Sequence, residues 1–308
     1  MKIIFMGNST IGCPILNALS HSKHELLAVV SNVPKRFGRG TSLSYTPVGQ
    51  LANELKLDFI PVDSLSNKDF QNTISQLDVD LFVVVAFRIL PKSFLSLSRK
   101  GAINLHGSLL PQYRGAAPIQ HALLNGDILT GISTFLIDDN LDTGPIILQK
   151  KIPIIEEDNY ISLSKKMAED GIDLIFESLD LLSSNDFIPI PQTKTKISYA
   201  PKISKKMLEI DWSLSAKQVN NTVRALCYIG VFTFINGKRL KIYNSKIFDL
   251  NNNSDIPGKV DIIDNTRIIV HCGKNKLELL EIQVESKQKM QVKDWLRGAK
   301  INSGDFLG

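Results

Sequence analysis

The chain has 308 residues, of which 43% are hydrophobic and 22% charged, and its formal net charge is +5. This length suggests about two domains, and the composition is that of an ordinary globular protein. No apolar run approaches the roughly 20 residues that a membrane-spanning helix needs. Three widely separated cysteines argue against a disulfide framework and against a clustered metal site. We therefore expect a cytoplasmic protein without a metal ion or a membrane partner, and a monomer by default.

The first 200 residues contain short apolar runs separated by helical patterns. The runs cover residues 2–6, 26–30, 81–86 and 102–105, and helical stretches follow the first run and recur near 47–57 and 67–77. Continuous apolar runs of this length are typical of parallel strands buried on both faces. We expect an open α/β sheet of Rossmann type, which binds ligands beyond the carboxyl ends of its strands. The segment 32–46, rich in basic residues and glycine, predicts a mobile loop.

The pattern changes towards the end of the chain. A strand-like segment at 145–155 and a helix of about 159–183 precede an irregular polar stretch at 184–207. Asn236-Gly237 then lies between two strand-like runs, which is a strong hairpin signal because both residues tolerate positive φ. Further short strands are expected at 258–263, 267–271 and 277–284, and a last helix at 291–298. The sequence thus predicts a catalytic domain at 1–188, a linker at 189–207 and a small β-barrel domain at 208–308.

The charge of the chain is unevenly distributed. Residues 201–308 contain 18 Lys/Arg and 11 Asp/Glu, so they carry a net charge of +7, while residues 1–200 carry −2. Taken alone, such an excess is better explained by a solvated lysine-rich surface than by a surface that faces nucleic acid. The second interpretation gains weight only if the rest of the chain points to a nucleic acid partner.

The densest group of polar residues lies at 104–118, NLHGSLLPQYRGAAP. Asn104 and His106 are two residues apart at the end of a predicted strand, so their side chains face the same side. An amide donor beside an imidazole, which acts either as a base or as a charged donor, suits the oxyanion of an acyl-transfer intermediate.

The segment 137–147, IDDNLDTGPII, supplies a third candidate, Asp142. A carboxylate brought beside His106 would orient the ring, raise its pKa and help to remove a proton. Each feature alone has a plainer explanation, because a lone histidine is more often structural and Asp-x-Gly more often a simple turn. Gly7 belongs to GNSTIG, which lacks the G-x-G-x-x-G spacing of dinucleotide-binding proteins. Spacing alone predicts an α/β enzyme of unknown reaction.

The string NLHGSLLPQYRGAAPIQHALLNGD, followed by NLDTG, resembles the folate-dependent formyltransferase family, and most closely its members that formylate methionyl-tRNA. The resemblance continues in VVVAF (83–87), ILPK (89–92), GRG (38–40) and IDWSLSA (210–216), and so covers nearly the whole chain. It implies a Rossmann-like formyltransferase domain followed by an OB-like barrel. It also implies transfer of a formyl group from 10-formyltetrahydrofolate to the methionine of initiator methionyl-tRNA, for translation initiation.

The resemblance also implies roles for particular residues. The family's catalytic asparagine, histidine and aspartate fall on Asn104, His106 and Asp142. The expected folate-binding residues are Phe87, Arg88, Ile89, Leu90, Ser108, Leu109, Leu110, Pro111 and Asp138. The expected tRNA-binding residues are Lys35, Arg36 and Arg39. The sequence departs from the family pattern at Arg88, where a glycine is common, and at Gly7-Asn8-Ser9.

Several alternatives remain open at this stage. A sugar-nucleotide N-formyltransferase would share the same three catalytic residues and the same folate donor. A glycinamide ribonucleotide formyltransferase or a formyl-folate hydrolase would not need the basic C-terminal domain. A non-catalytic RNA-binding protein would not need the intact Asn–His–Asp set.

Overall fold

The computed structural model describes residues 1–36, 43–184, 186–249 and 256–308. The chain divides into two compact units. The first unit comprises Met1–Pro118, Leu129–Pro153 and Ser164–Ala200, and the second comprises Ile119–Ile128, Ile154–Leu163 and Pro201–Gly308. Two short segments that precede Ser164 in the chain thus belong to the second unit.

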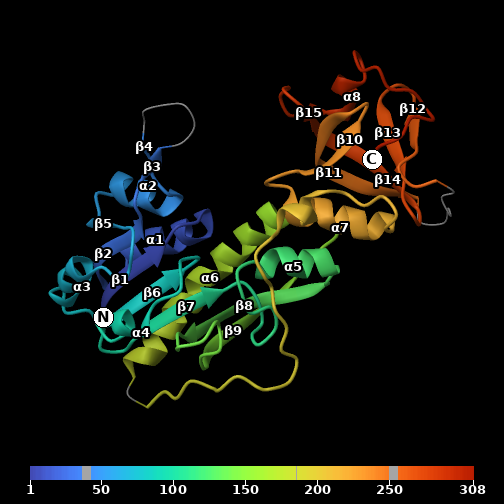
Figure 1. Ribbon diagram of the computed structural model, residues 1–308. Coiled ribbons are helices and arrows are strands. Elements are labelled where there is room, and N and C mark those ends of the chain that lie inside the picture. The colour runs from blue at the N-terminus through green and yellow to red at the C-terminus, as the bar shows by residue number, and fades with distance from the viewer. Residues whose placement is uncertain (37–42, 185, 250–255) are drawn as a thin grey trace. The chain divides into compact units, whose positions relative to one another are not determined.

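A seven-stranded sheet forms the centre of the first unit (Figure 1), in the order β5-β2-β1-β6-β7-β8-β9. Its strands are β1 (Lys2–Gly7), β2 (Glu25–Asn32), β5 (Phe59–Val62), β6 (Leu81–Val85), β7 (Ala102–His106), β8 (Leu129–Leu136) and β9 (Ile146–Pro153). The first five strands in this order are parallel, whereas β8 and β9 are antiparallel to their neighbours. The four apolar runs are confirmed as parallel strands, and the predicted strand at 145–155 is present as β9.

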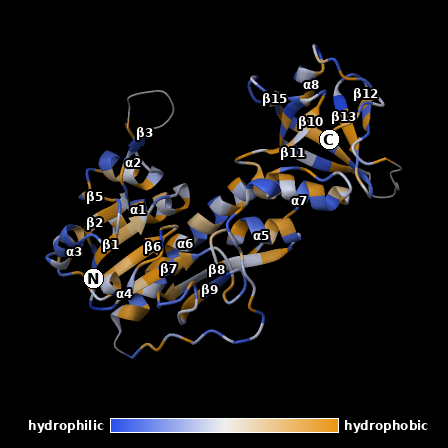
Figure 2. Ribbon diagram, viewed as in Figure 1, coloured by the Kyte–Doolittle hydropathy of each residue, from blue (hydrophilic) through white to orange (hydrophobic). Residues whose placement is uncertain are grey.

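The parallel strands are apolar because helices and loops cover both of their faces. All five residues of β6 are buried, and Figure 2 shows β1, β6 and β7 mostly in the hydrophobic colour. One core cluster includes Ile4, Val84 and Phe94, with Leu90 beyond the end of β6. This packed centre fixes the strand ends from which the polar residues emerge.

Helices of the first unit flank the sheet (Figure 1). They are α1 (Cys13–Ser20), which follows a 3-10 turn at Thr10–Gly12, then α2 (Pro47–Glu54), α3 (Lys68–Ser75), α4 (Lys92–Leu95) and most of α6 (Tyr160–Ser183). Side-chain caps explain two starts: Thr46 accepts a hydrogen bond from the Gly49 N–H, and Asn67 accepts one from Phe70. The helices expected near 47–57, 67–77 and 159–183 are confirmed, with slightly shorter ends.

Two connections differ from a plain loop. A short ribbon of β3 (Lys35–Arg36) and β4 (Leu43–Ser44) occupies the predicted loop 32–46, and residues 37–42 lie outside the described residues. The segment after α6 is irregular, as predicted, and up to Ala200 it belongs to the first unit. Ile190 pairs with Ile146, and Tyr199 pairs with Arg114.

The second unit is built on an antiparallel sheet of six strands, consistent with the predicted OB-like barrel. The strands are β10 (Val231–Ile235), β11 (Lys238–Asp249), β12 (Val260–Ile263), β13 (Arg267–His271), β14 (Lys276–Val284) and β15 (Met290–Gln291). The helices are α5 (Pro118–Asn125), a 3-10 turn at Lys205–Leu208, α7 (Ala216–Leu226) and α8 (Val292–Trp295). The predicted hairpin turn is present, since Asn236 and Gly237 have φ values of 48° and 72°.

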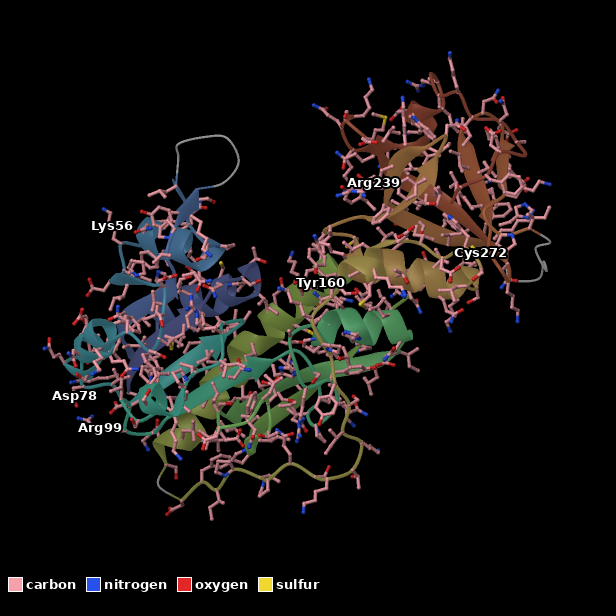
Figure 3. The ribbon with its side chains drawn as sticks, viewed as in Figure 1. Lys56, Asp78, Arg99, Tyr160, Arg239 and Cys272 are labelled. Atoms are coloured by element: carbon pink, nitrogen blue, oxygen red, sulfur yellow. The ribbon has the colours of Figure 1, made fainter. Side chains whose placement is uncertain are left out.

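Several side chains of the second unit pack against one another. Trp212 is buried and donates its indole N–H to the Thr233 hydroxyl at 3.0 Å. Figure 3 labels Arg239, whose guanidinium lies 4.4 Å from the centre of the Phe232 ring, and Tyr160, whose ring centre is 4.2 Å from that of Tyr228. Among the described residues, no helix is both long and apolar enough to cross a membrane.

Candidate active site

β7 presents the first two candidate residues. Asn104 and His106 both lie within this strand, two residues apart, so their side chains share one face of the sheet. Asn104 is half-buried, and its side-chain amide has no hydrogen-bond partner among the described residues. His106 is 5% exposed, and its ring packs edge-on against Phe135 of β8, with ring centres 6.4 Å apart. The amide is therefore available to a ligand, while the imidazole is held in place.

Asp142 reaches His106 through an unusual connection between β8 and β9. Because β8 is antiparallel to β7, its end at Leu136 lies beside Ile103, at the far end of β7 from His106. The chain folds back through Asp142, which has a left-handed backbone with φ of 53°. At Gly144 a Cβ atom would lie 1.7 Å from the Leu136 carbonyl oxygen, so only glycine fits this close approach. The Asp142 Oδ2 then lies 3.8 Å from His106 Nδ1.

The loop that follows β7 forms hydrogen bonds with both His106 and Asp142. Its Tyr113 carbonyl accepts a hydrogen bond from His106 Nε2 at 2.9 Å. Two residues later, the Gly115 N–H donates to Asp142 Oδ2 at 2.7 Å. Gly115 has φ of 128°, and a Cβ there would meet the Ala200 carbonyl at 2.6 Å. The loop is thus pressed against the 198–200 segment, and its backbone brings the imidazole and the carboxylate together.

The hydrogen bonds decide the tautomer of His106. A carbonyl oxygen only accepts, so Nε2 must carry the proton in the bond to Tyr113. The neutral ring therefore presents an unprotonated Nδ1 on the side of Asp142. Burial lowers the pKa of His106 more than the Asp142 charge and the Tyr113 carbonyl raise it. The sequence predicted a raised pKa; the Asp142 charge does act in that direction, but desolvation is the larger effect, so the pKa lies below its ordinary value and the neutral ring is favoured.

The remainder of the loop is fixed by buried hydroxyl groups. The Ser108 hydroxyl donates to the Gln112 carbonyl at 2.5 Å, and Ser133 of β8 donates to the Ser108 carbonyl at 2.6 Å. Ser133 also accepts from the Leu110 N–H at 3.0 Å. The amide of Gln149 donates to the Leu110 carbonyl and to Ser133. This network fixes the backbone beside the imidazole.

Comparison with known proteins gives this arrangement a family. The family model described as Formyl transferase matches residues 1–179, and the model of a formyl transferase C-terminal domain matches residues 202–300. The chain belongs to the formyl transferase family. The two matches together cover most of the chain, including β7, its loop and Asp142.

The similar sequences are full-length ones. A methionyl-tRNA formyltransferase of Caldanaerobacter subterraneus is 38% identical over 310 residues, and one of Caldicellulosiruptor saccharolyticus is 39% identical over 312 residues. In both cases the alignment covers 100% of this chain and 100% of the relative. The formyl transferase fold and its C-terminal domain are therefore shared along the entire chain.

Solved structures support the fold alone. A HypX variant from Aquifex aeolicus matches 100% of this chain and 51% of its own, with a TM-score of 0.69 and 16% identity. WlaRD, a sugar 3N-formyl transferase, matches 94% of this chain and 99% of its own, with a TM-score of 0.67 and 19% identity. At these identities the acceptor of each neighbour says nothing about the acceptor of this chain.

The predicted folate-binding residues around β6 have different environments in this formyl transferase. Leu90 is buried in the core cluster, Phe87 packs against that cluster and Ile89 is 75% exposed. Arg88 does not face solvent freely: its guanidinium donates to the Asn32 side chain and to the carbonyls of residues 62 and 63. Arg88 thus bridges the ends of β2 and β5, which the sequence did not predict.

The remaining predicted folate-binding residues lie on the loop after β7 and the connection after β8. Ser108 and Leu110 are buried, while Leu109 and Pro111 are half-buried. The Asp138 carboxylate accepts the single hydroxyl proton of Thr143, whose Oγ1 lies 2.7 and 2.9 Å from the two carboxylate oxygens, so this carboxylate stabilises the turn that contains Asp142. The assignment of these residues to folate stays a prediction.

The three predicted tRNA-binding residues lie at the short β3–β4 ribbon. Lys35 is exposed on β3, and Arg36 belongs to the same strand. Arg39 lies outside the described residues. Within the described part of the chain, no group of three or more His, Cys, Asp or Glu side chains could hold a metal ion.

Sequence reasoning missed three groups at this site. The Tyr113 carbonyl and the Gly115 N–H are backbone atoms, which no side-chain pattern identifies. Gln192 is the third: it lies in the segment that the sequence assigned to the linker, and its amide bonds to both Arg114 and the Asp142 turn. No spacing rule relates a position in an irregular segment to a loop about 80 residues earlier.

Proposed function

We propose that the chain transfers the formyl group of 10-formyltetrahydrofolate to the α-amine of methionine on initiator methionyl-tRNA. The observation that carries the proposal is the full-length similarity to methionyl-tRNA formyltransferases, which includes the C-terminal domain. The grouping of an available amide, a buried imidazole and a carboxylate supports it, because these groups suit acyl transfer. A solved neighbour crystallised with tetrahydrofolic acid shares the fold, which agrees with a folate donor.

The reaction begins with attack of the neutral α-amine nitrogen on the formyl carbon. A carbon–nitrogen bond forms and the carbonyl oxygen becomes an oxyanion, which accepts a hydrogen bond from the Asn104 amide. The amine proton moves to Nδ1 of neutral His106, the ring nitrogen that the Tyr113 bond leaves unprotonated. Asp142 stabilises the imidazolium that forms. The proton then moves to N10 of the folate as the bond between N10 and the formyl carbon breaks.

The folate site in this proposal lies around the ends of β6 and β7. It comprises Phe87–Leu90 and Ser108–Pro111, with Asp138 on the connection after β8. The fixed backbone of the 108–112 loop supports this placement, because preformed backbone groups can recognise a pterin ring with little ordering cost. Ile89 is the exposed apolar side chain of this group.

Two parts of the chain would hold the tRNA. The ribbon with Lys35 and Arg36, together with Arg39 in Gly-Arg-Gly, would contact the acceptor end, since arginine and lysine bind phosphate. The basic domain at 208–308 would contact the tRNA backbone through salt-sensitive charges. In this proposal the catalytic domain spans 1–188, the linker spans 189–207, and the enzyme works in the cytoplasm as a monomer.

One competition experiment tests the acceptor. The protein is incubated with 10-formyltetrahydrofolate and charged initiator methionyl-tRNA, with an amino-sugar nucleotide present as a rival acceptor. We expect formyl-methionyl-tRNA as the product and no formylated sugar. Formylation of the sugar alone would replace the proposed acceptor with that of the sugar N-formyltransferases.

A further inference from the structure

The Gln192 side chain makes four hydrogen bonds to segments that form the candidate site. Its Oε1 accepts from Arg114 Nε at 3.1 Å and from Arg114 Nη2 at 2.7 Å. Its Nε2 donates to the Asp142 carbonyl at 2.9 Å and to the Gly144 carbonyl at 2.8 Å. A primary amide has two N–H donors and one oxygen with two lone pairs, so every hydrogen-bonding position of this side chain is used.

The two segments joined by Gln192 are those that hold His106 and Asp142. Arg114 lies between Tyr113, whose carbonyl accepts from the imidazole, and Gly115, whose N–H donates to the carboxylate. Asp142 has a left-handed backbone, which aspartate and asparagine adopt more readily than other residues with a Cβ but which still gains from a restraint on the turn. The bonds from one amide to the carbonyls of residues 142 and 144 supply that restraint.

Other bonds place Gln192 itself. Its segment pairs with β9 at Ile190, through reciprocal N–H to carbonyl bonds with Ile146 of 2.7 and 2.8 Å. Further along, the Ser198 carbonyl accepts from the Arg114 N–H at 2.9 Å, and the Ser198 hydroxyl accepts from the Tyr113 N–H. The chain on both sides of Gln192 is therefore held by hydrogen bonds, so the Gln192 side chain can hold the turn that contains Asp142 in one position.

We infer that Gln192 is a positioning residue, which sets the distance between His106 and Asp142 by tying residues 113–115 to residues 142–144. The inference rests on the proposed function for its kinetic consequence, while the geometric consequence stands by itself. Neither a carboxylate nor a cation replaces this amide. Glutamate would turn an oxygen towards two carbonyl oxygens, and lysine or arginine would offer Arg114 no acceptor.

The test compares Gln192→Met, Gln192→Glu and a matched control, Gln71→Met. Methionine is close to glutamine in length and makes none of the four bonds, whereas glutamate keeps the acceptor for Arg114 and loses both donors. Gln71 lies on α3, is half-buried as Gln192 is, and donates to the Leu65 carbonyl at 2.7 Å, outside the candidate site. Gln71→Met therefore measures the general effect of losing such a side chain.

The kinetic readout separates positioning from stability. Loosening a catalytic pair by about 1 Å can cost about 100-fold in rate. We expect kcat for methionyl-tRNA formylation to fall about 10- to 100-fold in both Gln192 variants, with KM for folate changed less than about twofold. The control keeps the wild-type kcat. A kcat within about threefold of wild type in Gln192→Met, or an equal loss in the control, would refute the inference.

A second readout needs no substrate, so it distinguishes failure of the inference from failure of the proposed function. The pKa of His106 is measured by NMR titration of its ring protons in each variant. Asp142 is the ionisable side chain that acts on this ring, and its charge raises the pKa. Freeing the Asp142 turn weakens that effect, so we expect a lower pKa of His106 in both Gln192 variants than in wild type and in Gln71→Met. An unchanged pKa would overturn the inference whichever acceptor the enzyme uses.

Discussion

Replacing Asp142 by asparagine removes one charge from the candidate site and leaves its shape intact. Asparagine adopts the left-handed backbone readily, and its Oδ1 can accept the same Gly115 N–H bond. The charges of Asp142 and protonated His106 are 3.8 Å apart, and the side chains are only 12% and 6% exposed. At an effective dielectric constant of about 20, two unit charges at this distance attract by about 4 kcal/mol.

This attraction acts on the imidazolium and not on the neutral ring. Losing it therefore slows the step in which His106 accepts a proton. About 4 kcal/mol corresponds to a rate loss of about 1,000-fold. The assay is single-turnover formylation of methionyl-tRNA, measured across a range of pH for wild type and Asp142→Asn. Because the Asp142 charge raises the pKa of His106, the acid limb of the variant's profile should also move to lower pH.

The two results together test the mechanism. A rate within about tenfold of wild type would show that Asp142 does not stabilise a charge that develops on His106. An acid limb that moves to higher pH would refute the electrostatic argument itself, because removal of a negative charge cannot favour the protonated ring.

Four further predictions follow from the same structure. Asn104→Ala should lower kcat by about 100- to 1,000-fold, with little change in folate affinity measured by fluorescence titration, as expected of an oxyanion donor. Gly144→Ala should cost about 1–3 kcal/mol in the free energy of unfolding and should also lower kcat, because the new methyl group would clash with the Leu136 carbonyl; urea unfolding and turnover check both. The free energy of unfolding of wild type should fall relative to that of His106→Gln as pH falls through the ordinary histidine range. The reason is that the histidine of the unfolded chain binds a proton in this range, whereas burial lowers the pKa of the folded ring. Urea midpoints of the two proteins at several pH values check this, and a constant difference between them would contradict it. Raising the salt concentration should weaken tRNA binding steeply and folate binding only slightly, and equal slopes for the two ligands would argue against a basic tRNA-binding domain.

Much of the fold could be predicted because its local signals agree with its packing. The run LFVVV predicted β6, which is buried along its full length. Asn236-Gly237 predicted the hairpin, because its two positive φ values are a local requirement. β8 was missed: its sequence, LTGISTFL, mixes small polar residues with apolar ones, and its buried Ser133 and Thr134 find their partners only in the folded chain.

The side chains of the candidate site could be predicted from the sequence, but the backbone groups and the glutamine that hold them in place could not. Asn104, His106 and Asp142 have side chains whose chemistry is visible in the sequence. The protonation state of His106 depends on burial, which outweighs the neighbouring charge, and no local pattern gives the balance of two opposing effects. The left-handed turn at Asp142 likewise depends on a distant glutamine.

The composition of the second unit limits how this protein can be recombined with its relatives. Gln120 of α5 bonds to the Tyr228 hydroxyl, and Arg224 of α7 bonds to the carbonyls of Ile155 and Asp158. A Cβ at Gly126 would meet the Asn221 side chain at 2.7 Å, so the end of α5 is fitted closely to α7. A chimera with one crossover near residue 200 would separate these partners, and their replacements would come from another sequence. Exchange of the second unit therefore requires three exchanged segments, Ile119–Ile128, Ile154–Leu163 and Pro201–Gly308.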